Sequence, residues 1–426
     1  MPNIIPFRGV LYDPTKVNID DVVAPPYDVI SKAQQEKLYE RHPYNVVRLI
    51  LGKEEDPYSS AAEYSNEWMR LGILARDVQP ALYVLCQTFR DVNGRNVSRK
   101  GFIALCQLEE FEKKIVLPHE KTLSKPREDR LRLFKATNSN FSQVFSLYSD
   151  SKNHIDRVVN GLSKSQPAVD VVFENVHNNL WRLHDPVAIR QIRDDMQPKQ
   201  VLIADGHHRY ETALTYRDLM RSQNPSHDGT EPYNYVMMFF TNVNDEGLVI
   251  YPTHRIVHSL EMFDAKACLE KLREHFIVRE FKEREALLMA LSASSVRSFG
   301  VLLAGESSFF LLTLKPTSSA MELVKEDVAP EVKELDVTLL HSVVLRDILG
   351  ISVEAQEQKR NIEYVRDAAD AFSAVETKQA QLAFLMNPTK IEQVRAIATG
   401  GFTMPQKSTY FYPKLLSGLV LNMMTQ

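Results

Sequence analysis

Cysteine and long hydrophobic runs are both scarce in this sequence. Three cysteines occur, Cys86, Cys106 and Cys268, and their wide spacing matches neither a disulfide framework nor a metal-binding motif. No apolar run reaches the roughly 18 residues that a membrane-spanning helix needs, and no basic segment followed by an apolar one marks a signal peptide. These absences predict a protein of the reducing cytoplasm that does not enter a membrane.

Positive charge is not in excess either. The formal net charge is −4 at pH 7 and the isoelectric point is about 6.3, so a large basic surface for nucleic acid is not expected. No helix-turn-helix pattern, internal repeat or low-complexity tract is visible, and the GxxxxGK[ST] phosphate-binding loop is absent. We therefore expect a small-molecule substrate rather than a nucleic acid as the partner.

The length and the alternation of apolar segments predict several domains. With 426 residues and about 100–200 residues in a usual domain, two or three domains are expected. Runs of strand length alternate with segments of helical length, which predicts an α+β (mixed α/β) fold. We expect a catalytic region with N-terminal elaborations over 1–260, an α+β supporting domain over 261–330, and a C-terminal α+β segment over 331–426 that packs back on the catalytic region.

Turn signals divide the apolar segments into hairpins and single strands. Two strands flank the loop 90–95, whose Asn-Gly pair favours a hairpin. A second hairpin is predicted over 168–183. The continuous apolar run 235–240 predicts a buried strand, and the run 46–51 is also interpreted as a strand.

The densest group of chemically active residues lies where a strand is predicted to turn into a helix. Residues 201–204 form a short apolar run, Asp205-Gly206 signals a turn, and a helix is predicted from His207. The amide groups and the dipole at a helix N-terminus attract anions. Gly206 lets the backbone approach a ligand, and Arg209 offers a planar set of donors suited to phosphate or carboxylate.

This segment also has a structural interpretation. Asp205 could cap the helix, hold a divalent metal or take a proton from a substrate hydroxyl, and His207 and His208 could lie at the surface without a role. We favour a functional site, because one junction gathers two imidazoles, a guanidinium and a carboxylate, and loops on rigid scaffolds carry function disproportionately.

Three further segments carry candidate phosphate-binding residues. His119 and Glu120 stand together on a predicted loop, followed by Lys121 and by a basic helix that opens at Pro126. The remaining candidates are Arg127, Arg130, His254, Arg255, Lys407, Ser408, Thr409 and Lys414. Structural alternatives are a solvated basic helix face, a locally bonded His254 with Arg255 in solvent, and a docking role for the aromatic segment near the C-terminus.

Taken together, these motifs resemble those of domain-of-unknown-function family 1015. In chain order they are Pro6-Phe-Arg8, Ala24-Pro-Pro-Tyr-Asp28, His119-Glu120, Arg127-Glu-Asp-Arg130 with Ala136-Thr137, Asp205-Gly-His-His-Arg209, Pro252-Thr-His-Arg255 and Lys407-Ser-Thr-Tyr-Phe-Tyr-Pro-Lys414. They cover essentially the whole chain, which makes the match to the family specific.

More distantly, His119-Glu120 and Asp205-Gly-His-His-Arg209 resemble motifs of the free serine kinases in the ParB/sulfiredoxin superfamily. This resemblance implies a ParB/sulfiredoxin-like strand-turn-helix core. It also implies Mg²⁺-dependent phosphorylation of a small hydroxyl metabolite, such as free L-serine, with ADP or ATP as the donor. The long stretch between Glu120 and Asp205 departs from the compact kinases and requires an insertion.

The resemblance also implies a role for each residue. Glu120 would act as general base, and Asp205 would hold the metal or orient the hydroxyl. His207, His208 and Arg209 would stabilise the transferred phosphoryl group. Lys407 and Lys414 would close over the phosphates.

Other functions stay open at this point. The same residues could hydrolyse a phosphomonoester such as phosphoserine, with water in place of the nucleotide. A regulatory protein could use them to sense a phosphorylated metabolite without catalysis. A DNA clamp, as in other ParB relatives, is disfavoured by the net negative charge.

Overall fold

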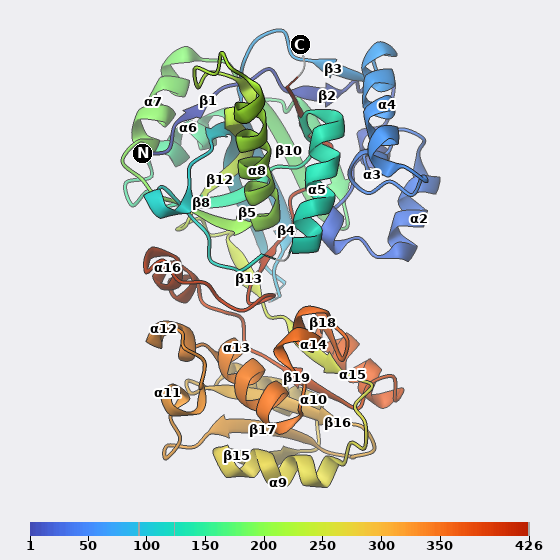
Figure 1. Cartoon of the computed structure of the whole chain (residues 1–426), viewed down its shortest axis with the longest axis vertical. Coiled ribbons are helices and arrows are strands. Elements are labelled where there is room, and N and C mark those ends of the chain that lie inside the picture. The colour runs from blue at the N-terminus through green and yellow to red at the C-terminus, as the bar shows by residue number, and fades with distance from the viewer. Residues whose placement is uncertain (93, 123, 425–426) are drawn as a thin grey trace. The chain divides into compact units, whose positions relative to one another are not determined.

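The computed structural model describes residues 1–92, 94–122 and 124–424 and divides into two compact units. Unit 1 comprises Met1–Pro118, Thr122–Val249 and Phe411–Gln426, and unit 2 comprises His119–Lys121 and Ile250–Tyr410. Helices and strands occur in both units (Figure 1), and the predicted α+β class is confirmed. Within the described part of the chain, no helix has the length and apolar character needed to cross a membrane.

Unit 1 is built on a mixed sheet, to which its described residues contribute nine strands. From edge to edge the order is β6 (Val116–Leu117), β11 (Val201–Asp205), β8 (Val144–Tyr148), β12 (Tyr235–Asn242), β5 (Asn96–Gln107), β4 (Leu82–Arg90), β10 (Val176–Leu183) and β9 (Val169–Phe173), and β1 (Ile4–Ile5) pairs with β5 outside this order. The pairs β11–β6 and β12–β8 are parallel. The pairs β4–β5 and β9–β10 are the two predicted hairpins, although Asn93 of the first turn lies outside the described residues.

Helices of unit 1 cover this sheet (Figure 1). They are α1 (Ile19–Val22), α2 (Lys32–Arg41), α3 (Val47–Ile50), α4 (Pro57–Arg70), α5 (Ser124–Thr137), α6 (His154–Leu162), α7 (Pro186–Met196) and α8 (His207–Gln223), with short 3-10 turns η1 (Tyr27–Val29), η2 (Phe111–Lys113) and η3 (Pro232–Asn234). Apolar side chains of α6, α7 and α8 share one core with the central strands. Helix α5 packs against α8.

The predicted strand over 46–51 is wrong, because this run forms the helix α3. The side chain of Asn45 accepts the N–H of Val47 at 2.9 Å, which satisfies a donor at the start of the helix. Val47, Leu49 and Ile50 are buried. Burial in a turn of helix therefore outweighs the strand preference of the β-branched residues.

Two small strand pairs complete unit 1. Strand β2 (Val10–Tyr12) pairs with β3 (Leu74–Arg76), and β7 (Ser139–Asn140) pairs with β21 (Asn422–Met423). The second pair ties the last described residues of the chain to the segment that follows α5. Unit 1 therefore includes a C-terminal segment that is remote in sequence from most of its sheet.

Unit 2 has an antiparallel sheet of six strands among its described residues. The order is β15 (Phe276–Phe281), β17 (Phe309–Leu314), β16 (Ser298–Leu303), β19 (Leu382–Leu385), β14 (His254–Val257) and β18 (Ile362–Val365). The helices are α9 (Ala265–His275), α10 (Arg284–Ser292), α11 (Ala320–Leu323), α12 (Pro330–Lys333), α13 (Asp336–Leu339), η4 (Leu340–Ile348), α14 (Val353–Glu357), α15 (Ala368–Glu376) and α16 (Ile391–Thr399). Strands β13 (Val249–Tyr251) and β20 (Tyr410–Tyr412) contain two of the points at which the chain passes between the units, and the others lie on either side of His119–Lys121.

Candidate functional site

The junction of β11 and α8 has the predicted strand-turn-helix geometry. Strand β11 ends at Asp205, and α8 begins at His207 after Gly206, whose φ of +91° is in the region that favours glycine. A Cβ atom on Gly206 would lie 2.8 Å from Nε of Arg209. Glycine at this position therefore allows both the left-handed turn and the return of the Arg209 side chain across it.

Asp205 contacts two cations. Its Oδ2 accepts a hydrogen bond from Nη2 of Arg209 at 2.9 Å, and its Oδ1 accepts one from Nζ of Lys414 at 2.8 Å. Gly206 takes the cap position without a side-chain hydrogen bond. Two cations thus lie at the N-terminus of a 17-residue helix, where the helix dipole also favours an anion.

His207 and His208 form the start of α8. The His207 side chain is buried, and that of His208 is partly exposed. Tyr210 makes the first backbone hydrogen bond of the helix, with the carbonyl of Gly206 at 3.1 Å. The amide groups of a first helical turn cannot bond to carbonyls of their own helix, and for this reason helix N-termini commonly bind anions.

Lys414 is placed by a buried arginine that the sequence analysis missed. Arg99 on β5 is fully buried, and its Nη2 donates to the carbonyl of Pro413 at 2.5 Å while Nη1 donates to that of Tyr412 at 3.3 Å. The guanidinium lies over the ring of Phe145 at 4.5 Å. Desolvation lowers the pKa of Arg99 to about 9. The sequence signal that could have indicated this role of Arg99 is its position just before the apolar half of a predicted strand.

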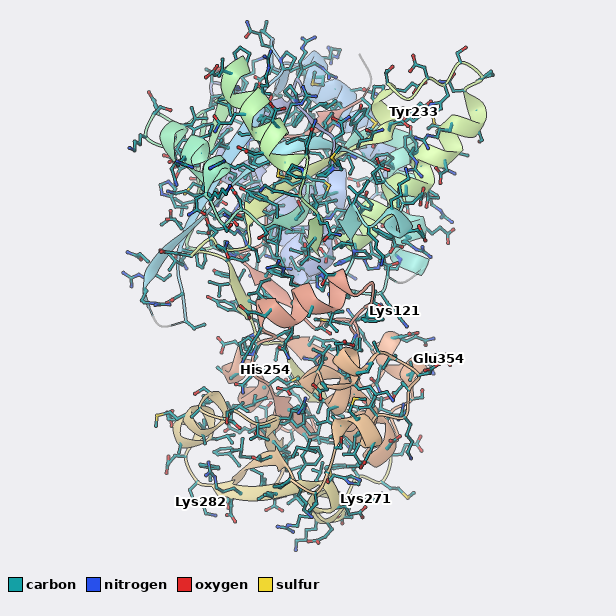
Figure 2. The ribbon with its side chains drawn as sticks, turned by 90° about the vertical axis from the view of Figure 1, so that its left-hand side faces the viewer. Lys121, Tyr233, His254, Lys271, Lys282 and Glu354 are labelled. Atoms are coloured by element: carbon teal, nitrogen blue, oxygen red, sulfur yellow. The ribbon has the colours of Figure 1, made fainter. Side chains whose placement is uncertain are left out.

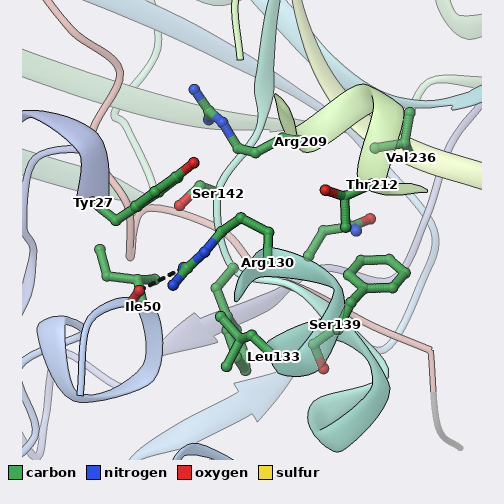
Figure 3. Close-up of a pocket in the computed structure, with 12 residues that line it drawn as sticks. Tyr27, Ile50, Arg130, Leu133, Ser139, Ser142, Arg209, Thr212 and Val236 are labelled. Atoms are coloured by element: carbon green, nitrogen blue, oxygen red, sulfur yellow. Dashed lines mark hydrogen bonds between the residues drawn. The ribbon is translucent and has the colours of Figure 1, made fainter. Parts of the chain in front are cut away.

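A pocket in unit 1 adjoins Arg209 (Figure 3). Its volume is about 500 Å³, including solvent at its mouth, and Arg130 of α5, Arg209 of α8, Tyr27 of η1 and Ser142 lie around it. Arg130 stacks on the Tyr27 ring at 4.1 Å and donates through Nη1 to the carbonyl of Ile50 at 2.6 Å. Of the two arginines predicted on this helix, the other, Arg127, pairs with Glu211 at 2.9 Å and is largely exposed.

The second group of predicted residues lies in unit 2. Oε1 of Glu120 accepts the backbone N–H of Lys407 at 2.9 Å, and Nε2 of His119 lies 2.9 Å from Oγ1 of Thr409. A parallel bridge between Glu120 and Met404 joins the two segments. The structure therefore brings the His-Glu pair together with the segment 407–409.

The remaining candidates of this segment differ in exposure. Ser408 is buried, and its hydroxyl donates to the carbonyl of Pro405 at 2.5 Å. Lys121 is exposed, whereas His254 lies inside unit 2 (Figure 2). Among the described candidates in unit 2, Lys121 is therefore the one whose side chain is exposed to solvent.

Arg255 is an internal brace of unit 2 and is only 1% exposed. Its Nη2 donates to the carbonyl of Lys407 at 3.1 Å, and its Nε donates to Nε2 of His341 at 3.2 Å. Nη1 donates to the carbonyl of Thr253. Each nitrogen thus contacts a protein acceptor. This placement differs from the solvent-facing alternative and favours a structural role.

Two buried histidines accompany this arginine. Nδ1 of His254 accepts the N–H of Met386 at 3.1 Å, and burial, with a contribution from Arg255, lowers the pKa of His254 to about 4. Burial also lowers the pKa of His341, which the sequence analysis missed, to about 3. Both imidazoles are therefore neutral acceptors at pH 7, which suits a position beside a buried guanidinium.

The surroundings of Asp205 do not fit a magnesium ion as they stand. Magnesium takes oxygen ligands in octahedral geometry, whereas each carboxylate oxygen of Asp205 already accepts from a cation. Among the described residues, no three His, Cys, Asp or Glu side chains gather closely enough to hold a metal ion. The assignment of Asp205 as a metal ligand stays a prediction.

Comparison with known proteins gives one family match. The family model described as Protein of unknown function (DUF1015) matches residues 4–338. No curated protein matches the chain. A conserved hypothetical protein from Pyrococcus furiosus is 14% identical, with a TM-score of 0.34, over 71% of this chain and 89% of its own.

Two further solved structures show a comparable likeness. A free serine kinase variant in complex with ADP is 12% identical, with a TM-score of 0.35, over 70% of this chain and 84% of its own. SbnI with a C-terminal truncation, from Staphylococcus aureus, is 9% identical, with a TM-score of 0.35, over 74% and 85%. Likeness at this level carries no information about the reaction.

Proposed function

Because the chain belongs to the DUF1015 family of proteins of unknown function through the match over residues 4–338, we propose a function from the chain's own side chains. The proposed function is that of a phosphotransferase, which uses a nucleotide to phosphorylate a small hydroxyl compound such as free L-serine. The observation that carries the proposal is the group formed by Asp205, Arg209 and Lys414 at the N-terminus of α8.

This group offers what phosphoryl transfer needs from a protein. The reaction asks for positioning and for stabilisation of charge on the transferred group, with little covalent chemistry. Arg209 and Lys414 would supply charge-assisted hydrogen bonds to phosphate oxygens, and Asp205 would hold both cations in place beforehand. His207 and His208 would add donors at the same helix end.

Glu120 is a separate part of the proposal. A general base needs an oriented carboxylate within hydrogen-bond reach of the hydroxyl. The hydrogen bond from the Lys407 N–H fixes one oxygen of Glu120. Replacing Glu120 by Gln keeps that hydrogen bond and removes the base, so the role of Glu120 can be tested without disturbing phosphate binding.

No step of the proposed reaction depends on a protein-bound magnesium ion, because both carboxylate oxygens of Asp205 already accept hydrogen bonds from Arg209 and Lys414. Nucleotides carry divalent cations into active sites on their own phosphates. The assays below therefore include magnesium, and a parallel series with a chelator measures its contribution.

The test is ³¹P NMR of the purified chain with ADP or ATP and L-serine, and with phosphoserine alone. The proposal expects a new phosphomonoester signal that grows as the nucleotide signal declines, and loss of that growth in Glu120→Gln and Lys414→Met. Release of inorganic phosphate from phosphoserine, without nucleotide consumption, would instead identify a hydrolase. Absence of any change with serine and with a panel of other small hydroxyl compounds would contradict transfer.

A further inference from the structure

The pocket between α5, α8 and η1 is not used by the proposed reaction. Arg209 alone belongs to both, since Asp205 and Lys414 are not among the residues that line the pocket. We name it the Arg130 pocket, after the α5 side chain that lies at its centre in Figure 3. Its shape and chemistry indicate a ligand of its own.

The polar part of the Arg130 pocket has donors in excess of acceptors. A guanidinium carries five N–H groups. The contacts of Arg130 to Asp129 and Ile50, and those of Arg209 to Gln143 and Asp205, use at most three of them on either side chain. The Tyr27 hydroxyl has no hydrogen-bond partner among the described residues. A ligand group here must therefore accept hydrogen bonds.

Charge decides which acceptor fits. Each pocket guanidinium already pairs with one carboxylate, Arg130 with Asp129 at 2.5 Å and Arg209 with Asp205 at 2.9 Å. A group with a single negative charge can accept charge-assisted hydrogen bonds from the remaining N–H groups, and it adds less uncompensated charge beside these two pairs than a phosphate dianion would. The planar fork of a guanidinium also matches a carboxylate in geometry.

The larger part of the remaining lining of the Arg130 pocket is apolar, and its other polar residues are Ser139, Asn140, Ser142 and Thr212. Leu133 and Phe134 of α5, Phe141, Ile50 and Val236 line it. These side chains offer no hydrogen bonds, so a polar ligand body would lose its water contacts without replacement. An aliphatic or aromatic body would gain from burial at about 25 cal/mol per Å².

We propose that the Arg130 pocket binds a small monocarboxylate with an apolar body. The carboxylate lies against Arg130, Arg209 and the Tyr27 hydroxyl, and the body lies against Leu133, Phe134 and Val236. This inference rests on the pocket alone and does not depend on the proposed phosphotransfer. Binding is therefore measured without nucleotide, so that failure of one idea leaves the other standing.

Isothermal titration with 3-phenylpropionate tests the inference. The neutral analogue 3-phenylpropanol, acetate and phenyl phosphate serve as comparison ligands. We expect 3-phenylpropionate to bind at least tenfold more tightly than each of them, because only it combines one negative charge with an apolar body. Equal or tighter binding of the alcohol or of the phosphate would overturn the inference, and so would absence of heat with every ligand at millimolar concentration.

Variants locate the site. Tyr27→Phe keeps the ring under Arg130 and removes only the hydroxyl, so the affinity for 3-phenylpropionate should fall about tenfold with an unchanged melting temperature. Arg130→Gln should abolish detectable binding. The matched control is Arg132→Gln on the same helix, because Arg132 is exposed and pairs with Glu128 at 2.7 Å. Wild-type affinity in both pocket variants, or an equal loss in Arg132→Gln, would contradict the assignment.

Discussion

A histidine precedes an arginine in each unit, at His208-Arg209 in unit 1 and at His254-Arg255 in unit 2, and the two pairs have different environments. Arg209 lies on the first turn of a helix, keeps 12% of its side chain exposed and pairs with a carboxylate. Arg255 lies on a strand, is 1% exposed and contacts two carbonyls and a neutral imidazole. The same dipeptide thus gives a candidate ligand site in one unit and an internal brace in the other.

The difference follows from local backbone geometry. A positive φ at Gly206 ends β11 and exposes a helix N-terminus, so the side chains that follow can meet a ligand. His254 and Arg255 continue into β14, a strand with neighbours on both sides, so their side chains are enclosed. Two consequences follow for variants: changes in the group around Arg209 should alter binding and turnover, and changes in the group around Arg255 should alter stability.

The largest expected effect is on turnover by Lys414→Met. Loss of one preorganised donor to a developing charge costs about 100- to 1000-fold in rate, while the free energy of unfolding should fall by only about 1 kcal/mol. The ³¹P NMR rate and a urea titration measure the two quantities. Arg127→Met is the matched control, because it removes an exposed ion pair of the same unit and should keep nearly full turnover. An equal loss of turnover in both variants would contradict a specific role of the Asp205 group in turnover.

Next in size is the loss of stability in Arg255→Met. The change leaves two carbonyls and the His341 imidazole without a donor, at a cost of about 3 kcal/mol in the free energy of unfolding of unit 2. Both tryptophans, Trp68 and Trp181, lie in unit 1, so their fluorescence follows that unit. Hydrogen exchange along β14 follows unit 2. If tryptophan fluorescence reports a loss in the free energy of unfolding as large as the loss that hydrogen exchange reports for β14, the stabilising effect of Arg255 is not confined to unit 2.

The histidines of unit 2 should make it sensitive to acid. The folded pKa of His254 is about 4 and that of His341 about 3, both below the ordinary 6.5. Unfolded chains therefore bind more protons, and stability is lost as pH falls from about 6.5 toward 4. His254→Asn keeps an acceptor near Nδ1 but does not titrate, so the loss measured by exchange along β14 should become smaller. His258→Asn, at the end of the same strand, should leave the full loss, and an equal response in both variants would contradict this account.

The smallest expected effect is the loss of phosphate affinity in Gly206→Ala. Strain at a φ of +91° costs about 1 kcal/mol, and the added Cβ would displace the guanidinium of Arg209. Affinity for inorganic phosphate, measured by titration calorimetry, should fall severalfold. Gly229→Ala is an apt control, because its φ is +94° and nothing lies within 4 Å of the added atom. It should show the same strain with unchanged phosphate affinity, and a similar loss of affinity in both would exclude displacement of Arg209 as the cause.

Local patterns allowed much of the fold to be predicted from the sequence. The two hairpins of unit 1 and the β11–α8 junction follow from turn residues and apolar runs, which act over a few positions. The helix α3 was mistaken for a strand because its burial depends on tertiary contacts. The three-part division of the chain at 260 and 330 stays a prediction.

The candidate site was predictable in its parts but not in its pairings. Asp205 and Lys414 are 209 positions apart, and nothing in a single sequence joins them. Arg99 was missed because it stands between Ser98 and Lys100 like an ordinary exposed strand residue, and His341 was missed because it is a single histidine in a mainly apolar segment. Their roles follow from which carbonyls and ring nitrogens the fold brings near them.

The segment Phe411–Gln426 has a consequence for the order of synthesis. A ribosome makes the chain from the N-terminus, so β11, α8 and all of unit 2 emerge before Lys414. Until then Asp205 lacks one of its two cations, and β7 lacks its partner strand β21. A nascent chain therefore carries an incomplete anion site however well its earlier parts have folded, and phosphate affinity should appear late, when translation has passed residue 414.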